Sequence, residues 1–166
     1  MQDPVIDSRE FRNTMGRFAT GVTVVTVKVG DQRRGMTANA VTSLSLHPPM
    51  LLVCVDKSAS MHPLFQVADS FAVNILAADQ KALSDFFARH SDAPEVLGGF
   101  PYREGVTGSP LVEGALASVE CHVSERIEGG DHIIVIGSVQ AIHNARPEDD
   151  PLLFFSGKYR AIAEAL

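Results

Sequence analysis

Several signatures of common enzyme classes are missing from this sequence of 166 residues. No GxGxxG pattern follows any expected strand, so the fingerprint of a dinucleotide-binding Rossmann fold is absent. A P-loop, an HExxH motif, a GxSxG motif and any His, Asp or Cys cluster with metal-ligand spacing are absent too. These absences argue against most hydrolases and kinases and against a metal site. Chemistry would then have to come from a bound organic cofactor that the protein positions.

Positive charge, cysteine and long apolar runs are also scarce. With 14 Lys and Arg against 20 Asp and Glu, the net charge is −6, and such a balance repels the phosphate backbone of nucleic acid. Cys54 and Cys121 lie far apart in apolar runs without a CxxC motif, so we expect two buried, reduced thiols in a cytoplasmic protein. No signal-peptide pattern opens the chain, and its apolar stretches are too short to cross a membrane.

The remaining composition is that of one globular domain over residues 1–166. Apolar residues make up 45% and charged residues 20%, with no repeat, low-complexity tract or linker. A chain of this length can bury roughly 68–70% of its unfolded surface without disulfides or metals.

Hydrophobic periodicity predicts a strand-rich chain with few helices. Strands are expected over residues 22–29, 35–46, 50–55, 71–76, 117–126, 132–143 and 151–155. Helices are expected over residues 7–19, capped by Asp7, over 60–68, and after a cap at Asp79. Strands that follow one another as hairpins argue against a parallel βαβ sheet. The pattern supports a β-rich α+β fold, and within that class an antiparallel barrel with flanking helices fits better.

The segment GMTANAVTSLSLHPP at residues 35–49 carries the strongest functional signal. It alternates like a strand, yet its polar positions hold only small side chains: Thr37, Asn39, Ser43 and Ser45. Small hydroxyls and an amide leave room for a flat ligand to approach the backbone, and they offer hydrogen bonds to its polar edge. An isoalloxazine ring is such a ligand. The alternative is an edge strand that happens to be rich in Thr and Ser.

Three further clusters have both a functional and an ordinary interpretation. Lys57, Ser58 and Ser60 combine a cation with hydroxyls near a helix start, as phosphate sites do, although the serines can also simply cap that helix. The run 129–132, GGDH, is either a plain hairpin turn or a place where His132 donates to a pyrophosphate or carboxamide. In FFSGKYR, residues 154–160, the cations can equally be ordinary surface residues.

Taken in order, these segments resemble the flavin reductase-like family of FMN-binding split-barrel proteins. The resemblance runs over nearly the whole chain and is carried by MGRFATGVTVVT (15–26), GMTAN (35–39), SLSL (43–46), FAVNIL (71–76), GDH (130–132) and PLLFFSGKY (151–159). It is closest to the small reductase components of two-component flavin-dependent monooxygenases. It implies a homodimeric antiparallel split β-barrel that uses NADH to reduce FAD or FMN and releases the product to a separate monooxygenase.

The resemblance also implies roles for individual residues. The isoalloxazine ring and ribityl chain would be lined by Thr37, Ala38, Asn39, Ser43 and Ser45, and bordered by Phe87 and Ala88. The flavin phosphate would meet Lys57, Ser58 and Ser60. The nicotinamide nucleotide would meet Gly130, Asp131 and His132, with Lys158 and Tyr159 nearby. In one departure from the family pattern, Asp56 stands where many relatives carry Asn or Gly, and it adds negative charge beside the phosphate stretch.

Hydride transfer needs no side chain as donor or acceptor, only stacked rings at roughly 3–3.5 Å. We expect backbone amides around residues 38–40, with the Thr37 and Ser43 side chains, to stabilise charge on the flavin, and His132 to act as the catalytic residue that orients NADH. Two alternatives stay open. One is an FMN-retaining oxidase of the pyridoxamine-phosphate oxidase type, which would need more cations than Lys158 and Arg160; the other is a non-catalytic flavin-binding protein.

Overall fold

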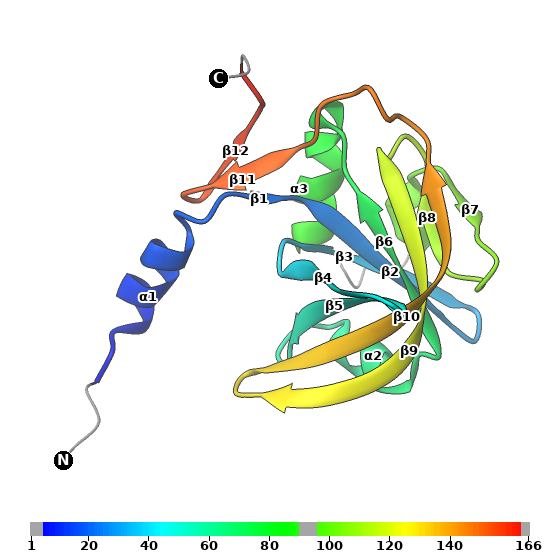
Figure 1. The fold of residues 1–166 in the computed structure, drawn as a ribbon, viewed down its shortest axis with the longest axis horizontal. Coiled ribbons are helices and arrows are strands. Elements are labelled where there is room, and N and C mark those ends of the chain that lie inside the picture. The colour runs from blue at the N-terminus through cyan, green and yellow to red at the C-terminus, as the bar shows by residue number, and fades with distance from the viewer. Residues whose placement is uncertain (1–4, 90–95, 164–166) are drawn as a thin grey trace.

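A curved seven-stranded antiparallel sheet forms the body of the protein in the computed structural model, which describes residues 5–89 and 96–163 (Figure 1). In spatial order its strands are β3 (Gln32–Ala38), β2 (Thr23–Val29), β6 (Ser70–Ile75), β9 (Ala117–Gly129), β10 (His132–Asn144), β5 (Pro49–Asp56) and β4 (Val41–Leu46). The two edge strands, β3 and β4, follow one another in the chain and are joined by Asn39 and Ala40 alone.

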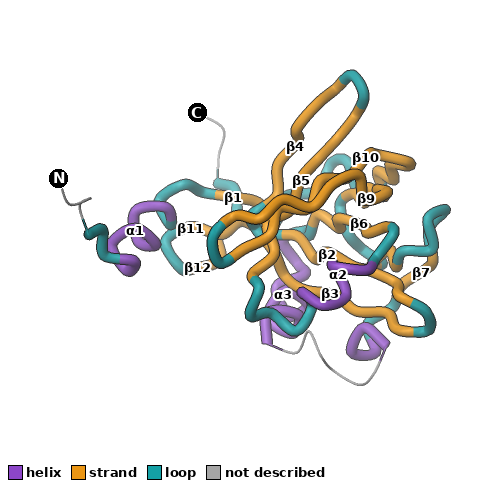
Figure 2. Tube along the Cα trace, turned by 90° about the horizontal axis from the view of Figure 1, so that it is seen from below, coloured by secondary structure: helices purple, strands orange, loops and turns teal. Residues whose placement is uncertain are grey.

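Smaller elements surround this sheet. They are a sheet of β1 (Thr20–Gly21), β11 (Leu153–Phe155) and β12 (Lys158–Arg160), a pair of β7 (Tyr102–Glu104) with β8 (Pro110–Val112), the helices α1 (Ser8–Met15), α2 (His62–Val67) and α3 (Lys81–Arg89), and the 3-10 segments η1 (Ala78–Gln80) and η2 (Val96–Gly99). Figure 1 shows α1 standing away from the body, and Figure 2 shows the β4–β5 hairpin extending beyond the rest of the sheet. In the described part of the chain, no helix is both long and apolar enough to cross a membrane.

Two apolar clusters hold the fold together. In the first, Phe65 of α2 packs edge-on against Phe71 of β6, with ring centroids 6.2 Å apart, and both side chains are fully buried. Gly137 is required beside them because a Cβ there would lie 2.6 Å from the Phe71 ring. The second cluster packs α3 on the sheet through Leu83 and Phe87. Together they bury the inner sheet face and fix the place of α3.

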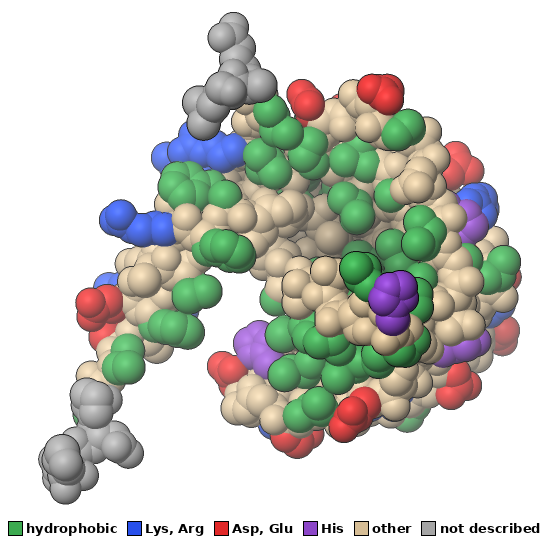
Figure 3. Space-filling view, viewed as in Figure 1, with side chains coloured by type: hydrophobic (Ala, Val, Ile, Leu, Met, Phe, Trp, Pro, Cys, Tyr) green, Lys and Arg blue, Asp and Glu red, His purple; other side chains and the backbone are tan. Residues whose placement is uncertain are grey.

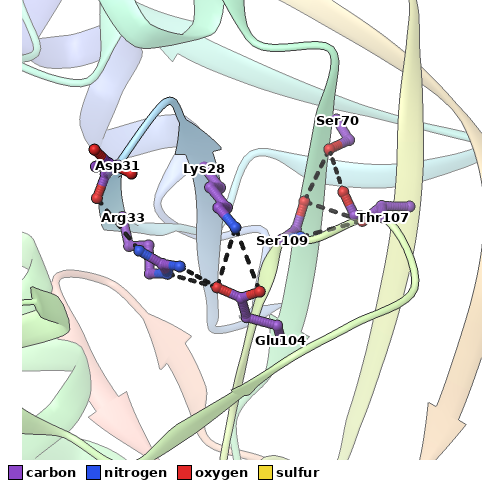
Figure 4. A network of polar contacts seen from close by, with 7 residues as sticks. All are labelled: Lys28, Asp31, Arg33, Ser70, Glu104, Thr107 and Ser109. Carbon is purple, nitrogen blue, oxygen red and sulfur yellow. Dashed lines mark hydrogen bonds and ion pairs between the residues drawn. The ribbon is translucent and has the colours of Figure 1, made fainter.

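Polar contacts fix β7 against the β2–β3 hairpin and the segment before β8 against the start of β6 (Figure 4). Glu104 forms ion pairs with Lys28 on β2 and Arg33 on β3. Nearby, the hydroxyls of Ser70 and Ser109 lie 3.2 Å apart. Since the ion pairs are exposed, they fix orientation more than they add stability.

The structure confirms most of the expected elements and corrects three of them. The expected strand 35–46 is two strands, because β3 pairs with β2 whereas β4 turns away to pair with β5. Asp7 does cap α1, accepting from the Glu10 N–H at 2.8 Å, but the helix ends at Met15 rather than near residue 19. Asp79 is not a helix cap: it lies inside η1 and its carboxylate pairs with Arg146.

The second long hairpin is confirmed, with β9 and β10 both longer than expected. The strands β1, β7, β8 and β12 were not predicted, because each has only two or three residues. Part of the expected loop over 90–110, namely residues 90–95, lies outside the described residues. Both cysteines are free thiols; Cys121 is buried as expected, but Cys54 is only partly buried.

Candidate flavin and nicotinamide site

A pocket of about 250 Å³ lies where β3 passes into β4, between the sheet and the end of α3. It is lined by Met36, Thr37, Ala38, Asn39, Ala40, Cys54, Asp56, Ala59, Phe87, Ala88 and His132. This volume is below the roughly 300–1,000 Å³ typical of pockets that enclose a drug-sized ligand. The pocket can therefore hold a ring system, while the rest of a dinucleotide would extend outside it.

Strand pairing brings the polar residues of the pocket together. His132 opens β10 directly opposite Asp56 at the end of β5, and Cys54 lies two residues before Asp56 on the same strand face. The Cys54 N–H donates to the Ala40 carbonyl at 3.0 Å, which fixes the β3–β4 corner to β5. Burial raises the pKa of the Cys54 thiol, so this side chain is neutral at physiological pH.

Helix α3 forms the opposite wall of the pocket. Close contacts with β3 fix the position of this helix. Thr37 donates its hydroxyl to the Ser84 carbonyl at 2.7 Å, so only the oxygen lone pairs of Thr37 are left for a ligand. The Ser84 hydroxyl in turn lies 2.8 Å from the hydroxyl of Tyr159 on β12. A Cβ at Gly35 would lie 3.0 Å from the Phe87 ring, so the absence of a side chain there lets that ring approach the strand.

Lys57 and Ser58, which were expected to meet the flavin phosphate, make hydrogen bonds within the protein instead. Asp56 Oδ1 accepts two hydrogen bonds from Ser58, one from its backbone N–H and one from its hydroxyl, each at 2.7 Å. The Ser58 hydroxyl, and then its N–H, hold the pKa of the Asp56 carboxyl below its usual value. Lys57 Nζ donates to the Gly130 carbonyl at 2.8 Å and forms an ion pair with Glu128. These groups bind the β9–β10 hairpin or one another.

His132 is held in place by its neighbour in the chain. Its Nδ1 lies 2.7 Å from Asp131 Oδ1, while the Asp131 side chain is 91% exposed. With Nδ1 held by the carboxylate, Nε2 is the ring nitrogen left for a ligand in the pocket.

Six of the residues expected at the site line this one pocket: Thr37, Ala38, Asn39, Phe87, Ala88 and His132. The others lie outside its lining. Lys57, Ser58, Ser60, Gly130 and Asp131 flank it, Ser43 and Ser45 lie further along β4, and Lys158 and Tyr159 lie on β12. Met36, Cys54 and Ala59 line the pocket without having been expected there, and Ala40, whose backbone amide was expected to face the flavin, lines it as well. For Cys54 the signal was its i, i+2 spacing from Asp56, which places both on one face of a strand.

Fold and site together define the class of protein. It is an antiparallel α+β protein with few helices, and it has a pocket the size of a ring system at the corner between its edge strands. The chain belongs to the Flavin reductase like domain family, whose model matches residues 15–163.

Named relatives cover nearly the whole chain. An NADH-dependent FAD reductase of Streptomyces globisporus is 43% identical, with 95% of this chain and 87% of the relative covered. An FMN reductase (NADH), SmoA, of Agrobacterium fabrum is 42% identical over 92% and 85%. The flavin-dependent monooxygenase reductase subunit HsaB of Mycobacterium tuberculosis is 36% identical over 95% and 83%. Among solved structures, the flavin reductase PheA2 in its native state matches with a TM-score of 0.87 and 44% identity, covering 96% of this chain and 100% of that one.

Proposed function

We propose that this single-domain protein is an NADH:flavin oxidoreductase, which transfers hydride from NADH to FAD or FMN and releases reduced flavin to a separate flavin-dependent monooxygenase. The observation that carries the proposal is a pocket walled by backbone, small side chains and one aromatic ring, inside the segment that the family model matches. The three named relatives support it as an FAD reductase, an FMN reductase and a monooxygenase reductase subunit. Two free thiols support a cytoplasmic location.

The residues present suit a flavin ring. At the β3–β4 corner, Ala38, Asn39 and Ala40 leave the backbone reachable, and the Asn39 amide offers both a donor and an acceptor. Phe87 gives a flat wall on the α3 side. The bound flavin supplies the hydride acceptor, and the chain holds it at a corner fixed to β5 and α3.

His132 serves the second substrate in this proposal. Asp131 orients the imidazole, and Nε2 is left to bond the carboxamide or pyrophosphate of NADH. Because hydride passes directly between rings stacked at roughly 3–3.5 Å, the protein contributes position and not a proton-transfer group. An oxidase acting on a phosphorylated amine is less favoured, since no Lys or Arg is found among the described residues that line the pocket.

The split barrel is part of the proposal and is supported by connectivity. The strands at the two ends of the seven-stranded order, β3 and β4, are separated by only two residues. Since three peptide units span at most about 11 Å, the sheet must curl until its edges meet at that corner. The edges diverge from there, because β4 continues into the projecting β4–β5 hairpin (Figure 2).

The homodimer is also proposed, and α1 supports it. No residue of α1 is buried, and Phe11 and Met15 on it are 61% and 52% exposed. A lone helix of eight residues is marginal in water, so α1 needs a surface to cover its apolar side. Figure 3 shows hydrophobic side chains both along α1 and on the part of the body that faces it across an open gap. A second copy that fills the gap would cover both.

Turnover with free flavin tests the proposed function. Purified protein is mixed anaerobically with NADH and a tenfold or larger excess of FAD or FMN, and flavin absorbance is followed. A reductase bleaches all the added flavin over many turnovers, whereas a flavin-binding protein only shifts the spectrum of one equivalent. Absence of bleaching with both flavins would refute the proposal.

A further inference from the structure

The charges around the pocket are unusual for a site that takes phosphorylated ligands. Of the described residues that line it, Asp56 is the only carboxylate, and none is Lys or Arg. The other titratable lining groups are His132 and the neutral thiol of Cys54. A phosphate beside this pocket would therefore meet a negative charge first.

Lys57, the cation next to the pocket, already has partners within the protein. Lys57 Nζ pairs with the Glu128 carboxylate and donates to the Gly130 carbonyl at 2.8 Å, and its backbone N–H donates to the Asp131 carbonyl at 3.0 Å. Its positive charge is thus compensated by Glu128 and directed at the β9–β10 hairpin. To bind a ligand phosphate, Lys57 would have to leave both partners.

The adjacent hydrogen-bond donors of Ser58 also have a partner within the protein. Ser58 gives both its N–H and its hydroxyl to Asp56 Oδ1, at 2.7 Å each. These bonds keep the pKa of Asp56 low, and the nearby imidazoles of His132 and His62 also favour its ionised form. The Asp56 carboxylate therefore takes both hydrogen bonds that Ser58 could otherwise give to a phosphate oxygen, and it is charged at neutral pH.

We propose that Asp56, together with Glu128, makes this pocket select flavins by ring and ribityl chain and not by the terminal phosphate, so that riboflavin is bound about as well as FMN. The inference rests on the proposed function and identifies which part of the flavin is recognised. The phosphate monoester of FMN carries close to two negative charges at neutral pH, so it is repelled by Asp56 while gaining little from Lys57. Neutral riboflavin escapes that repulsion.

Binding without NADH tests this, because no catalysis is needed. Dissociation constants for riboflavin and for FMN are measured by flavin fluorescence with wild type, Asp56→Asn and Asp56→Ala, at low and at high salt. The Asn variant keeps an oxygen that accepts from Ser58 but removes the charge, whereas the Ala variant also frees both Ser58 donors. The matched control is Asp149→Asn, which removes a carboxylate paired with Arg146 in a loop outside the pocket lining.

We expect wild type to bind the two flavins within about threefold of each other. Asp56→Asn should tighten FMN by roughly three- to tenfold, with riboflavin unchanged and the gain reduced at high salt because exposed charges are screened. Asp56→Ala should tighten FMN at least as much, and Asp149→Asn should change neither constant. If wild type prefers FMN by more than tenfold, or if the Asp56 variants leave the riboflavin-to-FMN ratio unchanged or weaken FMN, this inference is wrong while the proposed function stands. If wild type binds neither riboflavin nor FMN, this inference is also wrong, whereas the proposed function is decided separately by turnover with FAD and FMN.

Discussion

Thr37 on β3 donates its hydroxyl to the backbone carbonyl of Ser84 on α3 at 2.7 Å, which joins the two opposite walls of the pocket. Ser84 is fully buried, and its own hydroxyl lies 2.8 Å from that of Tyr159, so the C-terminal hairpin is connected to the same contact. Lys81 adds a cation–π contact, with Nζ 5.1 Å from the centre of the Tyr159 ring. The width of the pocket thus depends on bonds that lie behind its walls.

Replacing Thr37 tests this dependence. Thr37→Val keeps the side-chain shape but loses the bond to Ser84, and it should lower the free energy of unfolding by about 1 kcal/mol. We expect the dissociation constant for flavin to rise roughly three- to tenfold because α3 is no longer held against β3. Thr37→Ser retains the hydroxyl and should behave like wild type in urea unfolding and flavin titration. Equal behaviour of the two variants would show that the bond does not set the pocket.

His132 should affect the nicotinamide substrate far more than the flavin. His132→Ala removes the Nε2 group proposed to bond NADH, so the apparent KM for NADH should rise about tenfold or more, and that for flavin by less than threefold. Steady-state kinetics with each substrate varied in turn measure the two values. His122→Ala on β9, an exposed histidine outside the pocket lining, is the control and should change neither. Parallel increases in both KM values would remove His132 from this role.

The sequence predicted those parts of the fold that depend on residues close together in the chain, such as strand alternation and tight turns. Alternation placed most of the strands of the large sheet, and the Gly30-Asp31 turn placed the β2–β3 hairpin. Alternation did not reveal the break at Asn39 and Ala40, because β3 and β4 keep the same period of two while changing partner strands. The choice of partner is a tertiary property, and a single sequence does not encode it locally.

The same limit applies to the site. Residues on the β3–β4 segment were found because their small size is visible in the sequence, and Thr37, Ala38 and Asn39 do line one pocket. Cys54 was taken as a core thiol because strand alternation does not say which face of β5 looks inward. The partners of Lys57 and Ser58 were equally hidden, since Glu128 lies over seventy positions from Lys57 in the chain and meets it only through the pairing of β5 with β10.

Gly35 should tolerate no side chain without cost to the pocket. In Gly35→Ala the new Cβ would lie 3.0 Å from the Phe87 ring and 3.2 Å from a Val24 methyl, so α3 must shift outward. We expect a loss of about 1–3 kcal/mol in unfolding free energy and weaker flavin binding. The control is Gly21→Ala, since a Cβ at Gly21 would meet nothing within 4 Å. Flavin titration and urea unfolding that fail to separate the two variants would contradict this contact.

Glu120 should make the fold sensitive to acid. Burial raises the pKa of this carboxyl, but hydrogen bonds from the Thr107 N–H and hydroxyl, from His143 and from the Val106 N–H outweigh burial, and the pKa is lowered from 4.5. A lowered folded-state pKa means that this stabilisation is complete above the unfolded-state value and is lost as pH falls through the folded-state value, below 4.5.

Glu120→Gln should therefore destabilise the protein most at neutral pH. Its amide keeps one oxygen but replaces the other with an NH2 group, whose hydrogens would face either the Thr107 N–H or the Val106 N–H, at a cost of about 2–4 kcal/mol. The difference from wild type should shrink as the pH falls from 6 towards 3, because protonated Glu120 loses the same bonds. Urea midpoints across that range measure it, with Glu113→Gln, an exposed carboxylate, as the control. A difference that stays constant with pH would mean that the charge of Glu120 is not involved.

The apolar side chains of α1 and of the turn that follows it should decide whether two copies associate. Phe11 and Phe18 are 61% and 73% exposed in the single chain, and covering an aromatic side chain contributes about 1.5–3 kcal/mol. Because a homodimer would cover four of these side chains, the double variant Phe11→Ser, Phe18→Ser should raise the dimer dissociation constant by roughly four orders of magnitude or more, since each 1.4 kcal/mol is tenfold. Sedimentation velocity at micromolar protein should show a dimer for wild type and a monomer for the double variant. Val106→Ser removes an apolar side chain that is 76% exposed in a loop elsewhere, and it should remain dimeric. A wild-type monomer, or a double variant that stays dimeric, would mean that α1 is covered by something other than a second copy.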